Sequence, residues 1–214
     1  MATRTPTTPA TPIPEREPQD RRERRRAETR ERLLTAALEL FAAQGFVATT
    51  YEHIAERADT GRQTAFNHFR RKEDFVLAWV QRRHDLLDLL DRRERDADAA
   101  GDLTALEVLA EEMRALAELN EQEYALLKEL HDAGVLHSAF SLGSTTPHAL
   151  LAAVTRGQQR DEIRSGLDPE TVADLVFDAY IGTLSRWLRA DGGFALAEAL
   201  LARLDVLATG FRVA

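Results

Sequence analysis

Apolar residues recur along most of the chain at the three- and four-residue spacing of an amphipathic helix, and no long stretch alternates with the period of a strand. The pattern therefore predicts an all-α protein. The first helix is expected from about residue 22 to residue 44, and Gly45 is expected to end it as a C-cap. Its apolar face consists of Leu33, Leu34, Ala37, Leu38, Leu40 and Phe41.

Two short helical patterns follow around a glycine-containing turn. Thr49 stands three residues before Glu52, the spacing of a capping box that would open the first of them. Residues 59–61 form the predicted turn, and a third helix is expected at about residues 62–69. Its outward positions carry side chains that can hydrogen-bond to base edges: Arg62, Gln63, Thr64, Asn67 and His68. This is the outline of a helix-turn-helix.

The rest of the chain predicts a larger helical body. A fourth helix should begin at residues 72–74, shorter ones should follow, and a loop is expected at residues 143–147. The last two helices, at about residues 169–190 and 194–211, are the most apolar, so we expect a second copy of the chain to cover them. The candidate dimer-interface residues are Leu184, Leu196, Leu200, Leu204 and Leu207.

The charges divide unevenly along the 214 residues. The net charge is −8, but residues 20–75 hold 12 basic and 10 acidic residues, whereas residues 76–214 hold 14 and 24. Five arginines also cluster at residues 21–26, where Arg22, Arg25 and Arg26 are candidates for contacts with phosphates or the minor groove. The alternative is a solvated helix end, because Glu23 and Glu28 interleave with the arginines.

Composition and termini bound the remaining possibilities. Residues 1–20 have few large apolar side chains and predict a disordered tail, followed by a helix-turn-helix domain at 21–75 and a larger helical domain at 76–214. The chain has no cysteine, and it lacks both the apolar run of a signal peptide and that of a membrane span. We therefore expect a cytoplasmic protein without membrane contact.

No catalytic or cofactor motif is present in the sequence. There is no glycine-rich phosphate loop, no nucleophile elbow and no paired-histidine motif, so the chain is not expected to be an enzyme or to need a cofactor. His84 and Asp88 stand four residues apart, but no third ligand lies near them in the sequence, which argues against a metal site. A helix-turn-helix that binds only proteins is a further alternative; the polar outward face of the third helix argues against it.

Residues 29–75 resemble the N-terminal domain of the TetR family of bacterial transcriptional regulators. The resemblance is carried by residues 41–46, 48–50, 54–55, 64–69 and 72–74. It implies about nine helices, a homodimer formed by the last two, and a C-terminal ligand cavity whose occupancy changes the spacing of the DNA-reading parts. It also implies that Thr49, Thr50 and Lys72 bind phosphate and that residues 62–68 read bases. The chain departs from the family at residues 59–61, where Gly-Val-Ser is usual, and at Phe66, where tyrosine is usual.

The resemblance therefore predicts a dimeric, ligand-responsive regulator, most simply a repressor that binds a pseudo-palindromic double-stranded operator and is released by an unknown small molecule. An activator without such release is the alternative. Candidate residues for the ligand pocket are Met113, Tyr124, Phe177 and Tyr180. Aromatic residues and methionines at helical spacing also occur as plain core, so these four have that second interpretation.

Overall fold

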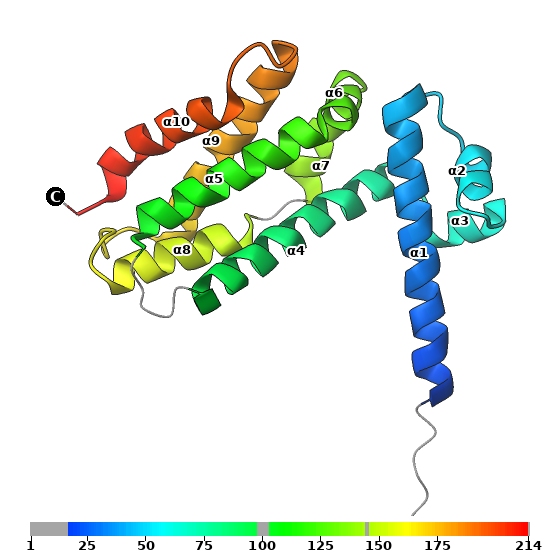
Figure 1. Cartoon of the computed structure of the whole chain (residues 1–214), viewed down its shortest axis with the longest axis horizontal. Coiled ribbons are helices and arrows are strands. Elements are labelled where there is room, and N and C mark those ends of the chain that lie inside the picture. Colours follow the sequence, from blue (N-terminus) through cyan, green and yellow to red (C-terminus); the bar gives the residue numbers. More distant parts are fainter. Residues whose placement is uncertain (1–16, 98–102, 144–145, 214) are drawn as a thin grey trace, which may run out of the picture.

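The computed structural model describes residues 17–97, 103–143 and 146–213, and these residues form ten helices and no strand (Figure 1). The all-α prediction is confirmed. The helices are α1 (Glu17–Gln44), α2 (Tyr51–Arg57), α3 (Arg62–His68), α4 (Glu73–Ala97), α5 (Ala105–Gln122), α6 (Tyr124–Asp132), α7 (Val135–Gly143), α8 (His148–Gln159), α9 (Pro169–Arg189) and α10 (Leu196–Phe211). None of these described helices is long and apolar enough to span a membrane.

Helix α1 begins earlier than its apolar pattern. Its first residue is Glu17 rather than residue 22, because arginine, glutamate and glutamine favour helix without any apolar face. The predicted tail is corrected accordingly: residues 17–20 are helical, and residues 1–16 lie outside the described part of the chain. At its other end the helix stops as expected, since Gly45 has φ +94° and its amide donates to the carbonyl of Phe41 at 3.1 Å.

The start of α2 lies one residue later than predicted. Thr50 is the N-cap, and its hydroxyl accepts from the amide of His53 at 3.3 Å. Thr49 is only 1% exposed, and its hydroxyl donates to the carbonyl of Gly45 at 2.8 Å. The capping box predicted at Thr49 is therefore wrong, because that hydroxyl ties the loop back to the end of α1 instead.

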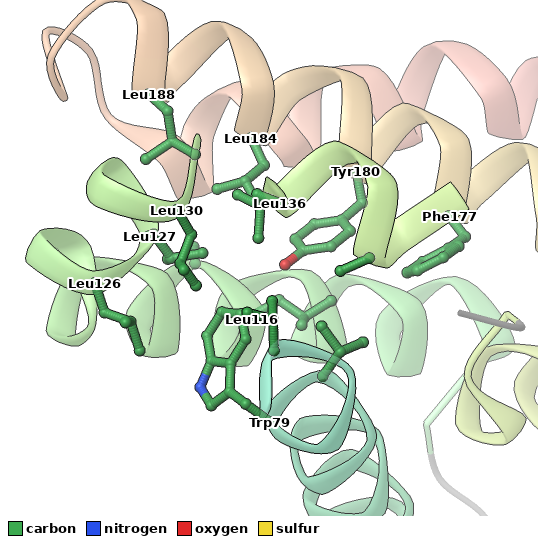
Figure 2. Packing of buried hydrophobic residues seen from close by; sticks show 14 of the residues in the cluster. Trp79, Leu116, Leu126, Leu127, Leu130, Leu136, Phe177, Tyr180, Leu184 and Leu188 are labelled. Carbon is green, nitrogen blue, oxygen red and sulfur yellow. The ribbon is translucent and has the colours of Figure 1, made fainter. Parts of the chain in front are cut away.

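Helix α4 leaves the amino-terminal helices and packs on α7 and α8 of the body (Figure 1). Helix α10 packs on α5 and α9, and α8 packs on α5, α9 and α4. The segment after Tyr124 forms two helices, α6 and α7, which are separated at Gly134, with φ +74°. Figure 2 shows where α4, α5, α6, α7 and α9 converge, with Trp79 and Tyr180 facing the leucines of α6 and α7.

Candidate nucleic-acid interface

Helix α3 has one buried face and one exposed face. Ala65 is fully buried, and the helix packs on α2. Phe69, the C-cap, is 1% exposed, and its ring stacks on Phe75 of α4. The turn before it bends through Asp59, with φ +48°, and the N-cap is Gly61, which offers no side-chain hydrogen bond. The helix-turn-helix prediction is confirmed, and Gly61 serves where a serine cap is usual. Arg62, Gln63 and Asn67 are exposed, whereas Thr64 and His68 are half-buried.

The exposed side chains of α3 already contact one another and α2. Arg62 Nε lies 2.7 Å from Glu52 Oε1, and Gln63 Nε2 donates to Asn67 Oδ1 at 3.1 Å. Both pairs are exposed, so water or a base edge can replace either partner at little cost. Their donors are thereby ordered on one face of α3 before any DNA arrives.

His68 ends α3 at its junction with α1. Its carbonyl accepts from Arg30 Nη1 at 3.0 Å, and the Arg30 guanidinium lies 4.1 Å from the centre of the Phe69 ring. Burial, followed by the positive charges of Arg26 and Arg30, lowers the pKa of His68. The imidazole is therefore neutral at pH 7 and can both donate and accept a hydrogen bond.

Lys72 does not lie as a phosphate ligand would. Its Nζ donates to the carbonyls of Phe46, Thr49 and Val47 at 2.7, 3.0 and 3.2 Å, and it lies 4.6 Å from the centre of the Phe46 ring. Burial lowers the pKa of Lys72. Since three carbonyls occupy its three N–H groups, we correct the predicted phosphate contact to a structural one that holds the loop between α1 and α2. The buried Thr49 is likewise removed from the predicted phosphate contacts, while Thr50 remains exposed.

Two residues that the sequence did not single out also support α3. The hydroxyl of Tyr51 donates to the carbonyl of Phe69 at 2.8 Å, and Arg30 binds the adjacent carbonyl. Burial, followed by the charges of Asp74 and Glu73, raises the pKa of Tyr51. Both residues satisfy carbonyls at the end of the short helix. No local sequence signal could have shown this, because the partners lie 18 and 38 residues away.

The candidate pocket residues are only partly brought together. Met113 and Tyr180 line a small cavity of about 10 Å³ between α5, α9 and α10, barely the size of one water molecule. Phe177 stacks on Tyr180, with ring centres 5.8 Å apart. Tyr124 is separate, because its ring packs edge-on against Trp187 at 5.2 Å.

A buried polar network links this core to α4. Arg83 is 5% exposed, and its guanidinium bonds to Glu123, between α5 and α6, and to Asn120 of α5. Asn120 Nδ2 donates to the hydroxyl of Tyr180 at 3.1 Å. Trp79 Nε1 donates to Glu123 at 3.4 Å. The network fixes α4 against α5 and α9 at the point where α4 enters the body.

A second link joins the body to the loop between α1 and α2. Glu129 Oε1, on α6, accepts from the amide of Phe46 at 3.0 Å. A Cβ at the preceding residue, Gly45, would lie 3.0 Å from the same oxygen. Any displacement of α6 therefore acts directly on the loop that Lys72 also holds.

Asp88, which stands four residues after His84, has a structural partner at the start of α8. No group of three potential ligands gathers anywhere in the described chain, and Asp88 Oδ1 accepts from the amide of Ala149 at the start of α8 at 3.0 Å. The carboxylate thus caps a helix.

The predicted dimer-interface leucines lie inside the chain. Leu184, Leu196, Leu200 and Leu204 are at most 6% exposed, because α10 packs on α5 and α9 of the same chain. Only Leu207 is half-buried. The four buried leucines are therefore wrong as interface residues, since a second copy cannot bury them further. The apolar side chains left outward on α9 and α10 are Leu175, 50% exposed, and Val206, 69% exposed.

Comparison with known proteins identifies the family to which this fold belongs. Residues 33–79 match the sequence profile of the bacterial regulatory proteins of the tetR family. The HTH-type transcriptional regulator TcmR of Streptomyces glaucescens is 30% identical over 209 residues, which cover 87% of this chain and 85% of TcmR. The chain belongs to the TetR family. TetR-family members are DNA-binding transcriptional regulators, and no sign of catalysis accompanies the match.

Two further TetR-family proteins extend the match over the body. The regulator TtgR of Pseudomonas putida is 28% identical over 179 residues, 75% of this chain and 80% of TtgR. The crystal structure of Thermus thermophilus FadR, a TetR-family repressor in complex with lauroyl-CoA, superposes with a TM-score of 0.68 at 29% identity, covering 86% of this chain and 96% of FadR. The similarity therefore includes α5–α10 as well as the helix-turn-helix.

Proposed function

We propose that the protein is a ligand-responsive repressor that binds a pseudo-palindromic operator as a homodimer in the cytoplasm. The observation that carries the proposal is the exposed polar face of α3, a helix held by its buried Ala65 and by the contacts of Arg30 and Tyr51 with its carboxyl-terminal end. In this proposal residues 21–75 form the DNA-binding domain and residues 76–214 the domain for ligand and partner. Two copies of α3 would enter major grooves about 34–36 Å apart.

Arg62 and Gln63 are the proposed base-reading residues, supported by Asn67, Thr64 and His68. An electrophoretic mobility shift with the duplex upstream of the protein's own gene tests this. Replacing Arg62 or Gln63 by alanine should cost about 1–3 kcal/mol on that duplex and little on a random duplex. Arg114→Ala, on the exposed surface of α5, is the matched control. Equal losses on both duplexes would assign the residue to phosphate contact instead.

For the effector we propose a molecule with a long apolar part, supported by the lauroyl-CoA in the related FadR. The cavity of about 10 Å³ beside Tyr180 would have to widen to admit such a chain. The effector would release DNA by preferring a domain spacing that the operator does not allow. Titrating lauroyl-CoA into the protein–operator complex tests this, with free CoA as the control for the polar part. If the protein–operator complex persists at saturating lauroyl-CoA, the proposal of an acyl-chain effector is refuted.

The dimer would use the outward side of α9 and α10, centred on Leu175, Ala179, Gly182 and Val206. Small residues there allow two copies to approach closely, since a Cβ at Gly182 would meet no atom within 4 Å. Val206→Glu should yield monomers in sedimentation, whereas Val213→Glu, beyond the end of α10, should not. A Val206→Glu protein that remains dimeric would move the interface elsewhere.

A further inference from the structure

The amino-terminal part of α1 projects from the protein, and within residues 21–32 it is held to α3 and α4 through Arg30 and Glu31. Among residues 21–44 the first buried one is Leu33, and residues 17–32 span about 24 Å at 1.5 Å per residue. Figure 1 shows this segment passing beyond α2 and α3. Its side chains from Arg21 to Glu28 are exposed. A helix without apolar contacts gains nothing from folding onto the body, which leaves its surface available to a partner.

The charges on this helix are arranged by face. Arg22, Arg26 and Arg30 follow at four-residue spacing and therefore share one side. That side is turned toward α3, because Arg30 binds the carbonyl of His68 and Arg26 is close enough to lower the pKa of His68. The three arginines thus form a row that begins at the end of α3 and leads away from it.

The other faces of the helix are turned elsewhere. Arg24 is seven residues, two turns, before Glu31, whose Oε1 accepts from Arg82 of α4 at 2.8 Å. Arg24 therefore lies on the α4 side. Arg21 shares a face with Glu28, which lines a groove of mixed charge that also includes Glu39, Asp59, Arg25, Arg32 and Arg57.

We propose that residues 17–32 are a second DNA-contacting element, a rigid helical arm whose Arg22 and Arg26 bind phosphates flanking the bases read by α3. The proposal rests on the proposed function and adds to it a surface outside the helix-turn-helix. The partner is DNA because the row continues from the reading helix, carries positive charge on the side facing it, and contains no apolar residue that a protein partner would bury. Arg25, on the groove side with Glu28, is not part of this row.

The test compares two double variants with the same loss of charge. The Arg22→Ala, Arg26→Ala protein should lower the log–log salt slope of operator binding by about 3.6, since each phosphate contact contributes about 0.9 and the dimer loses two contacts on each protomer. The Arg21→Ala, Arg24→Ala protein should change the slope by less than about 0.5. Alanine favours helix, so circular dichroism should report an intact arm in both. The ratio of affinities for operator and random DNA should stay unchanged, because α3 still reads the bases.

Hydroxyl-radical footprinting supplies a second readout. The Arg22→Ala, Arg26→Ala protein should lose backbone protection at the flanks of the site and keep it at the centre. Two results would refute the DNA-contacting role of residues 17–32: an unchanged salt slope with unchanged protection of the flanking backbone, or equal losses of slope in both double variants. In either case, operator binding by the wild-type protein would still support the proposed function. A wild-type protein that does not retard the upstream duplex at all would overturn both.

Discussion

Replacing Glu123 by alanine tests how much the buried network around Arg83 stabilises the fold. The change removes the carboxylate beside a guanidinium that is 5% exposed. Removing one member of a fully buried ion pair costs about 3–5 kcal/mol, because the other charge stays buried. The Glu123 side chain is 28% exposed, so water reaches the site and we expect a smaller loss, about 2–3 kcal/mol of unfolding free energy.

The assay is urea unfolding at one fixed protein concentration, because a dimer couples stability to concentration. Glu121→Ala, an exposed acid two residues away, should stay within about 0.5 kcal/mol of wild type. Adding Arg83→Met to Glu123→Ala removes the stranded charge, so the double variant should lose at least about 1 kcal/mol less than the sum of the two single variants. A Glu123→Ala protein as stable as Glu121→Ala, or strictly additive losses, would refute the reasoning.

Three further predictions concern stability. Gly157→Ala should lower the free energy of unfolding by about 1–3 kcal/mol, and with it the melting temperature. The reason is that the new Cβ would lie 2.6 Å from Ala105 Cβ and 2.8 Å from Ile163 Cδ1. An unchanged or higher melting temperature would show that α5 and α8 can separate there. Burial lowers the pKa of His84, so the unfolded chain binds more protons and the unfolding free energy should fall as pH drops below about 6.5. His84→Gln should flatten that fall, and an identical pH profile would contradict it. Thr50→Ala should cost about 1 kcal/mol in urea unfolding through the lost cap of α2, and a change below about 0.3 kcal/mol would contradict that.

The sequence predicted the elements that depend on local signals. Helical periodicity located most helices, Gly45 marked the end of α1, and the turn at residues 59–61 separated α2 from α3. Two consecutive threonines could both cap α2, and only the tertiary bond of Thr49 to Gly45 decides between them. The start of α1 escaped prediction because its charged residues carry no apolar period.

Long-range partners explain the remaining errors. Periodicity identifies which face of α10 is apolar but not which helix covers it, so Leu200 and Leu204 were assigned to a second copy although α5 and α9 cover them. A lysine at the start of α4 can bind phosphate or carbonyls, and Lys72 binds three carbonyls. Arg83 gave no sequence signal, because its partners stand 37 and 40 residues away.

The bond between Glu129 and the amide of Phe46 limits how far the two halves of this regulator are interchangeable. A foreign DNA-binding domain must supply both the backbone amide and the glycine before it, because φ +94° disfavours any other residue and a Cβ there would lie 3.0 Å from Glu129 Oε1. A chimera that joins a different helix-turn-helix to α4 would therefore assemble only if the donor also carries glycine at the position of Gly45.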